Sequence, residues 1–468
     1  MNRTGPQKYK EIFGIAGSLY FVGYGLMLAY LSSYFWDDWY NYFDVSMNDF
    51  RRSTGPFSGY NPLRVLFEGY LAENVPSLFR FLIFVFYPVS AIFLLLILKR
   101  ATSLLTVECY SVFLLFLLIP VNSSRTSMTN FGYAMTHCAF FVGWWLFSGK
   151  RRWWTFILSL GFFLISFDTA SFLVYMAIPL LHSFFEHRGA KGGFMDWIKR
   201  NIIFVLSPIA YWFIELDINP TLNSVRATYY TPSLSGVLRG LVVGMLIAFF
   251  AGYFVVIRGW RYRTNRGGVQ VLVGLLFTWL GMFPYMALGH FPNLNALLIG
   301  FVPGASDWDS RHQLLMPLGL ALVIVGVLNF LNPARLWAGV LVVCGLSTVL
   351  NLTFSQEYYL DSIKTQRIIE AFRSNPDVRE FNMALIDDQA LRFNARGRGI
   401  RSYEWDYMLR AANPDLEQTT DVYRYVDCDV MDPDAIIVIQ ASNGKLETLL
   451  TRNPGITVSV QKISVCNK

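Results

Sequence analysis

Long apolar segments separated by short polar ones fill the first three quarters of the chain. A helix that crosses a bilayer needs about 20 mostly apolar residues. Segments that meet this pattern lie at 12–35, 78–98, 102–121, 131–148, 153–167, 170–185, 201–216, 237–257, 269–289, 312–331 and 336–354. Residues 1–354 are therefore expected to form an all-α polytopic membrane domain with about eleven transmembrane helices.

From Ser355 onward the apolar content falls and the charge rises. A helix is predicted at 361–373, and further helices at 402–411 and 443–452. Short β-branched segments predict strands, at 381–386, 435–440 and 456–465. Residues 355–468 are thus expected to form a small α/β domain. Cys428 and Cys466 both lie in it, and either a disulfide or two free buried thiols is compatible with the sequence.

Composition agrees with a membrane protein. Hydrophobic residues make up 54% of the chain and charged residues 15%, whereas soluble domains carry roughly 25% charged residues. The formal net charge of +7 does not indicate nucleic-acid binding, because no basic stretch is interleaved with an exposed binding surface.

The basic residues of the loops alternate along the chain. Loops that share the side of the N-terminus hold seventeen Lys and Arg residues, and the loops between them hold six. Short loops rich in Lys and Arg remain cytoplasmic, so the N-terminus is expected inside and the C-terminal domain outside, in the periplasm or beyond. Segment 12–34 is too long for the apolar part of a signal peptide and is expected to remain as an anchor. The structured first loop, 36–77, would then face the exterior.

Two adjacent carboxylates, Asp37 and Asp38, directly follow the first predicted span. Neighbouring carboxylates repel each other, which can raise the pKa of one of them and suit it to act as a general base. The rings of Trp36 and Tyr40 beside them could stack on a sugar. The alternative is a solvated interfacial belt of acidic and aromatic residues.

The same loop continues with a predicted amphipathic helix on the membrane surface. Pro62 follows a possible cap, Asn61, and suits the first helical position. Leu63, Leu66, Phe67 and Tyr70 would form an apolar face, with Arg64 and Glu68 away from it. A second helix is predicted over 45–52.

An acidic pair after the first span, followed by amphipathic helices and a Pro-Leu segment, resembles the GT-C class of polytopic glycosyltransferases. The pattern is most similar to the bacterial GtrII-like glucosyltransferases and more distantly to protein mannosyltransferases. It covers the first seventy or so residues and the many-span layout. The sequence departs from the family at Asn61-Pro62-Leu63, where many members carry an Arg before Pro-Leu; Arg64 is the possible substitute.

The resemblance implies a GT-C-like membrane domain in a bacterial cytoplasmic membrane. It implies transfer of a sugar, with inversion, from a polyprenyl-phosphate donor to a glycan, lipid-linked or protein acceptor on the exterior face, with no cofactor. Asp37 would be the base, with Asp38 as the competing choice, and basic residues would stabilise the leaving phosphate.

The segment 306–313 is the expected phosphate site. Arg311 could bind a phosphate bidentately, His312 could add a hydrogen bond, and the start of a helix would favour an anion. Trp308 and, in the turn between two short spans, Asp168 are candidates for substrate contact. Arg311 could instead pair with a neighbouring aspartate, and Asp168 could be a helix cap. Arg125 and Arg226 could contact phosphate or glycan, or be solvated loop residues.

Other functions remain open from the sequence. An O-antigen-type polymerase or ligase would depend on exterior Arg and His more than on the acidic pair. A transporter would need polar or broken helices at the midplane, and few ionisable residues lie deep within the predicted spans. An acyltransferase would need a paired catalytic histidine, and His312 has no clear partner. One carboxylate pair without further ligands does not indicate a metal site.

Overall fold

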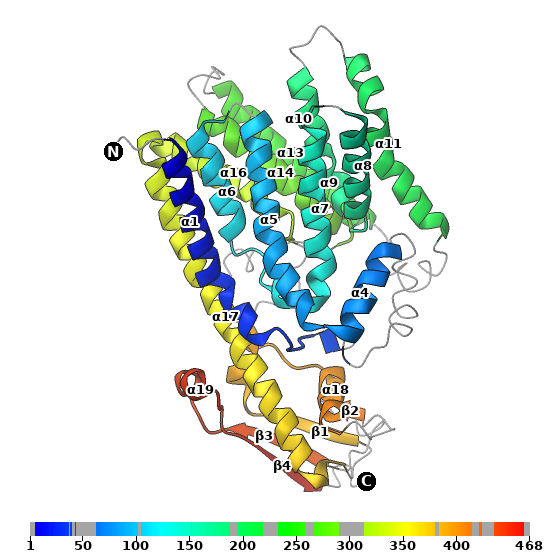
Figure 1. The fold of residues 1–468 in the computed structure, drawn as a ribbon, viewed down its shortest axis with the longest axis vertical. Coiled ribbons are helices and arrows are strands. Elements are labelled where there is room, and N and C mark those ends of the chain that lie inside the picture. The colour runs from blue at the N-terminus through cyan, green and yellow to red at the C-terminus, as the bar shows by residue number, and fades with distance from the viewer. Residues whose placement is uncertain are drawn as a thin grey trace.

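The computed structural model describes most of the chain. The described residues are 5–36, 38–39, 43, 62–101, 104–150, 152–169, 171–187, 194–218, 233–257, 266–289, 313–379, 383–413, 421–423 and 435–462. They form a bundle of helices with a small domain attached at one end, and the N-terminus lies at the opposite end (Figure 1).

The bundle consists of helices that follow the predicted apolar segments closely. In chain order they are α1 (Gly5–Tyr24), η1 (Gly25–Tyr30), α4 (Pro62–Asn74), α5 (Ser77–Ala101), α6 (Thr106–Leu118), α7 (Phe131–Phe147), α8 (Trp153–Phe167), α9 (Ser171–Tyr175), α10 (Ala177–His187), α11 (Phe194–Ile218), α13 (Leu234–Ile257), α14 (Arg266–Ala287), α16 (Met316–Leu331) and α17 (Leu336–Ser374). Every predicted span overlaps one or two of these helices, so the helical type of each segment is confirmed.

Four helical segments of the described chain are long and apolar enough to cross a membrane by length and composition. They are Lys10–Tyr30, Ser77–Arg100, Arg266–Ala287 and Pro333–Ser374. The other predicted spans coincide with helices that are shorter or less apolar, such as Thr106–Leu118 and Met316–Leu331. A membrane protein is supported, whereas the expected number of eleven spans is not.

Apolar side chains cover much of the outer surface of the bundle. On α17, Val342, Leu346 and Val349 form a stripe with exposed fractions of 63%, 62% and 61%, at the spacing of one helix face. On α13, Met245 and Phe249 are similarly exposed. Contiguous apolar surface of this kind is costly in water and suits contact with lipid.

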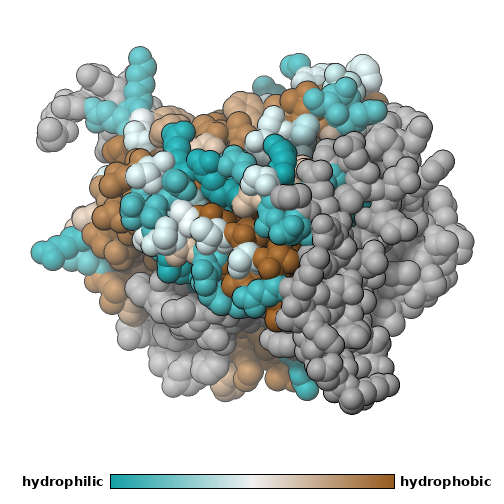
Figure 2. Space-filling view, turned by 90° about the horizontal axis from the view of Figure 1, so that it is seen from below, coloured by the Kyte–Doolittle hydropathy of each residue, from teal (hydrophilic) through white to brown (hydrophobic). Residues whose placement is uncertain are grey.

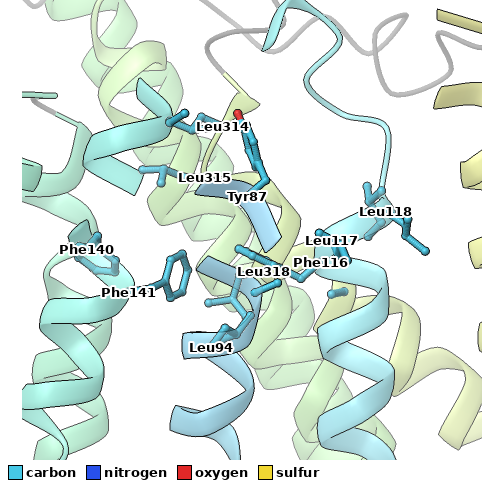
Figure 3. Packing of buried hydrophobic residues seen from close by; sticks show 14 of the residues in the cluster. Tyr87, Leu94, Phe116, Leu117, Leu118, Phe140, Phe141, Leu314, Leu315 and Leu318 are labelled. Carbon is cyan, nitrogen blue, oxygen red and sulfur yellow. The ribbon is translucent and has the colours of Figure 1, made fainter. Parts of the chain in front are cut away.

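The interior is closely packed with aromatic and aliphatic side chains. Phe116 of α6, Phe141 of α7 and Leu318 of α16 belong to one buried cluster, to which α5 adds Tyr87 and Leu94 (Figure 3). His137 stacks on Phe116 with ring centroids 5.6 Å apart. This histidine therefore belongs to the hydrophobic interior rather than to a reactive group.

Helices α14 and α16 approach each other through glycines spaced seven residues apart. Gly267 and Gly274 of α14 face Gly326 and Gly319 of α16, in antiparallel order. A Cβ atom at Gly267 or Gly274 would lie 2.6 Å from the carbonyl oxygen of the facing glycine. Only glycine allows this backbone contact, which is a common way for helices to associate in membranes.

Hydrogen bonds show which loops share an end of the bundle. Arg100 Nη1, at the end of α5, donates to Trp145 O near the end of α7, at 3.2 Å. Asn329 Nδ2 of α16 bonds both Glu108 Oε1 of α6 and Gln270 Oε1 of α14. These contacts join the end of α5 to the end of α7, and the start of α6 to the start of α14 and the end of α16, while the topology expected from the charge alternation stays a prediction.

Helix α17 continues without a break from the bundle into the C-terminal domain (Figure 1). The expected boundary at 354/355 therefore falls inside a helix. Charged residues of its second half hold the segment 394–398: Asp361 Oδ2 accepts from Ala395 N at 2.9 Å, and Lys364 Nζ donates to Asn394 Oδ1 at 2.6 Å. The bundle and the domain consequently share one rigid element.

The C-terminal domain is built on a four-stranded sheet with strand order β2-β1-β3-β4. Strand β1 (Met383–Asp388) pairs in parallel with β2 (Asp421–Tyr423) and β3 (Ala435–Ala441), and β3 pairs antiparallel with β4 (Ile456–Lys462). Helix α18 (Ser402–Ala412) precedes β2, and α19 (Lys445–Thr451) connects β3 to β4.

The predicted α/β character of this domain is confirmed. Its core joins Ile368 and Phe372 of α17 with Met408 of α18 and Ile437 and Ile439 of β3. The alternation along β3 places these two isoleucines on one face. Strand β2, only three residues long, was not predicted. Cys428 and Cys466 lie outside the described residues, while the three described cysteines, Cys109, Cys138 and Cys344, are buried.

The predicted amphipathic helix exists as α4, starting at Pro62. Glu68, Leu71 and Ala72 are buried against the protein, whereas Phe67 and Tyr70 are 42% and 56% exposed. Phe67 and Tyr70, two of the four expected apolar residues, thus face outward, as a helix on a membrane surface requires, but Glu68 points inward rather than to solvent. The helix predicted over 45–52 lies outside the described residues.

Candidate functional site

A polar loop lies buried between α6 and α7, at the end of the bundle nearest the C-terminal domain. Residues 122–130, here called the polar loop, have the sequence Asn-Ser-Ser-Arg-Thr-Ser-Met-Thr-Asn, and all but Thr129 are buried. Polar loops normally lie on the surface because their backbone groups need water. This one must find its partners inside the protein.

The carboxylate of Asp38 is one of those partners and is 0% exposed. Its Oδ1 accepts hydrogen bonds from Ser127 Oγ at 2.6 Å and from Thr129 N and Oγ1 at 2.8 and 3.0 Å. Its Oδ2 accepts from Phe35 N at 3.1 Å and from Arg80 Nη2 at 3.4 Å. Asp38 therefore anchors the chain after the first helix to the polar loop.

Arg80, in the first turn of α5, neutralises Asp38 and is also 0% exposed. Its Nε donates to Thr126 O, and Nη1 donates to Tyr30 O and Leu31 O, at 2.6, 2.5 and 2.8 Å. Nη2 adds a bond to Ser33 O at 2.9 Å. With the Asp38 contact, all five N–H groups of the guanidinium have acceptors.

This arrangement gives Asp38 a structural role. Burial raises the pKa of its carboxyl, and Arg80, Ser127 and Thr129 oppose that rise by stabilising the charged form. A general base must reach the proton of a substrate hydroxyl, and both oxygens of Asp38 are occupied within the protein. Asp37 lies outside the described residues, but its two neighbours are fixed.

Trp36, on the other side of Asp37, is fixed by the C-terminal domain. Its ring is 5% exposed and lies beneath the guanidinium of Arg398, with 5.3 Å between Arg398 Cζ and the ring centroid. Tyr358 of α17 packs edge-on at 5.5 Å. A sugar would have to displace these groups to stack on Trp36, so the structure gives no support to the expected sugar contact.

Arg125, within the polar loop, is a second buried guanidinium and is only 5% exposed. Its Cζ lies 3.1 Å from the ring centroid of Tyr24 and 4.8 Å from that of Tyr87. Its Nε and Nη2 have no hydrogen-bond partner, and no carboxylate of the described chain pairs with it. Burial lowers the pKa of Arg125 to about 9, which leaves it positive at neutral pH. It is not a solvated loop residue.

The remaining predicted site residues are not assembled by the described structure. Asp168 ends α8 and is half-buried; the next residue, Thr169, bonds Thr136 of α7 through their hydroxyls at 3.0 Å. Arg64 belongs to α4, but its side chain is outside the description, as are Tyr40, Trp308, Arg311 and His312. Arg226 is outside it as well.

Neither Arg80 nor the residues that contact Trp36 were predicted from the sequence. Arg80 lies within a predicted span, and the count of basic residues that predicted the topology covered only the loops, so Arg80 was not considered. An arginine in an apolar segment is itself a signal, because such a charge is costly unless it is paired. The density of Ser, Thr and Asn in the polar loop was a second signal. Nothing local indicated Arg398 or Glu404, which are distant in sequence.

The described part of the face seen from below is largely hydrophilic, with hydrophobic residues along its margin (Figure 2). Among the described residues no three His, Cys, Asp or Glu side chains are grouped as a metal site would require. No family model matches the chain, and no curated protein is significantly similar to it.

Proposed function

We propose that this protein is a membrane glycosyltransferase that takes a sugar from a polyprenyl-phosphate donor and transfers it to a glycan, lipid-linked or protein acceptor at the exterior face. The observation that carries the proposal is Arg125, a buried cation without an acidic partner in the described chain. An uncompensated buried charge is expensive and is kept where it serves a ligand. A phosphate is the group that a guanidinium binds best.

The neighbourhood of Arg125 supports this choice. Ser127, two residues along the polar loop, donates to Asp38 at 2.6 Å, so the loop that carries the proposed phosphate site also binds the second residue of the acidic pair. Asp37 is the proposed base that removes the proton from the acceptor hydroxyl, and Arg125 stabilises the phosphate that leaves. Arg311 and His312 remain proposed further contacts.

An apolar groove at the outer surface of the bundle supports a lipid-linked donor. The groove, of about 520 Å³, lies between α13 and α14 and is lined by residues such as Leu241, Met245, Leu276 and Trp279. Its walls offer hydrocarbon and aromatic surface to an isoprenoid chain, which a water-soluble nucleotide sugar would not need.

The test compares the two aspartates in purified protein with a panel of polyprenyl-phosphate hexoses and an envelope acceptor fraction. We expect Asp37→Asn to abolish transfer while expression and membrane insertion stay unchanged. Asp377→Asn, which changes an exposed carboxylate of the C-terminal domain, is the control and should keep full activity. Transfer that persists in both Asp37→Asn and Asp38→Asn would refute the base assignment.

A polymerase or ligase acting on polyprenyl-linked glycan is the second candidate, and Arg125 favours it equally. Such an enzyme would depend on the cation rather than on the acidic pair. Loss of activity in Arg125→Gln with normal activity in Asp37→Asn would favour this second function.

A further inference from the structure

Trp36 adopts a backbone conformation that a tryptophan rarely takes. Its φ is +49°, one of three positive values among the described non-glycine residues. A bulky side chain in this region is strained, and it persists only where its surroundings hold it there. Such strain at Trp36 indicates that the described residues on either side of Asp37, Trp36 and Asp38, here called the acidic turn, are held in place by contacts from elsewhere in the chain.

Residues of the C-terminal domain fix the position of Trp36. Glu404 of α18, which is 0% exposed, accepts a hydrogen bond from Trp36 N at 3.2 Å through Oε2. Arg398 lies over the ring of Trp36 and pairs with Glu404 at 2.8 Å and with Asp361 at 2.9 Å. Burial alone would lower the pKa of Arg398, but the two carboxylates outweigh it and raise the pKa above its usual value. Arg398, Glu404 and Asp361 therefore form a cluster of charged side chains that pair with one another.

Glu404 is itself held rigidly. Its Oε1 accepts from Arg401 N at 3.0 Å and caps the start of α18, while Oε2 reaches Trp36. The two oxygens thus join the first turn of α18 to the backbone of the acidic turn. A contact with a backbone N–H sets the path of the chain and does not depend on which side chain is present.

The acidic turn is held from the bundle and from the domain at once. Asp38 is bonded to Arg80 and the polar loop, whereas Trp39 belongs to the core of the C-terminal domain with Leu360 and Phe372. Asp37 lies between one residue fixed by the domain and one fixed by the bundle.

We propose that the C-terminal domain positions Asp37 through the acidic turn, with Glu404 as the positioning residue. This inference rests on the proposed function, because it assigns a task to the residue proposed as the base. The domain is then part of the catalytic apparatus, rather than only an acceptor-binding or partner-binding module.

The experiment uses Glu404→Gln in the full-length protein. Glutamine keeps the size of the side chain but has one acceptor oxygen, so it cannot serve Arg401 N and Trp36 N together. Glu404→Asp keeps the charge beside Arg398 but is too short to reach both groups, and it serves if Glu404→Gln folds poorly. Glu447→Gln, in the first turn of α19 and exposed, is the matched control.

Two measurements are made on each variant. The first is the ¹⁹F resonance of 5-fluorotryptophan at position 36, assigned through Trp36→Phe; it should shift or broaden in both Glu404 variants and stay unchanged in Glu447→Gln. The second is steady-state transfer. We expect kcat to fall about 10- to 100-fold with KM for the donor unchanged, because a displaced base slows chemistry without weakening binding.

The outcomes separate this inference from the proposed function. An unmoved resonance overturns the positioning role whatever the protein does. A moved resonance with unchanged kcat also overturns it, because the turn would then not matter for chemistry. If the wild-type protein transfers no sugar but the resonance moves, the hold on the turn is supported and the proposed function is what fails.

Discussion

One buried arginine, Arg80, binds the polar loop and another, Arg125, belongs to it, and they differ in what surrounds them. Arg80 donates to Thr126 O, and Arg125 is the residue just before Thr126. Arg80 has Asp38 and four carbonyl oxygens as acceptors. Arg125 has aromatic rings around it and two nitrogen atoms without an acceptor in the described part of the chain.

The difference shows that burial alone does not tell whether a charged side chain has its hydrogen-bonding groups satisfied within the protein. Both side chains are withdrawn from water, and both pay the desolvation cost of a buried ion. Around Arg80 that cost is recovered by bonds that fix the path of the chain at Tyr30, Ser33 and Asp38. Around Arg125 it is recovered only in part, by cation–π contacts, so a bound anion would complete the site.

Removal of Arg80 should produce the largest loss of stability. Arg80→Met would leave Asp38 as an uncompensated buried carboxylate and several carbonyl groups without donors, at a cost of about 3–5 kcal/mol. The measurement is thermal unfolding in detergent, followed by circular dichroism. Arg367→Gln, which breaks a largely exposed ion pair with Glu370, should change the unfolding midpoint little. A midpoint near the wild-type value for Arg80→Met would show that the bonds of Arg80 to Asp38 and to the carbonyl groups do not stabilise the fold.

Asp38→Asn should be the next most destabilising change. An amide keeps one acceptor oxygen and places N–H groups among the donors of Ser127, Thr129 and Arg80, which costs about 1–3 kcal/mol. The carbonyl bonds of Arg80 persist, so the loss should be smaller than for Arg80→Met. The same unfolding assay tests this order, and the reverse order would mean that the carbonyl bonds of Arg80 add little stability and that the bonds from Asp38 to the polar loop dominate.

The sequence predicted much of the fold because its signals are local. The strands β1, β3 and β4 follow from β-branched segments, and α4 follows from the position of Pro62. The continuity of α17 also had a local signal, since no Gly or Pro occurs between Gly345 and Pro376. The three-residue strand β2 is too short to carry a pattern of its own, and it forms because β1 offers it an edge.

The candidate site was less predictable because its contacts join distant parts of the chain. Asp38 and Arg80 are 42 residues apart, and Trp36 and Glu404 are 368 apart. An acidic pair after an apolar segment can be read from sequence, but which member is bonded internally depends on the packing of α5 and the polar loop. For the same reason, Arg125 could not be told apart from a solvated loop residue.

Arg125→Gln should change stability least and binding most. The lost cation–π contacts are offset by removal of a desolvated charge, so we expect the free energy of unfolding to change by no more than about 1 kcal/mol. Equilibrium binding of polyprenyl phosphate in nanodiscs should weaken at least tenfold, while Arg367→Gln should bind like the wild type. If Arg125→Gln instead unfolds as readily as Arg80→Met and binds the lipid normally, Arg125 is a packing residue. The two arginines would then differ only in the groups that they contact, and not in function. The phosphate of the donor would have to bind to another cation.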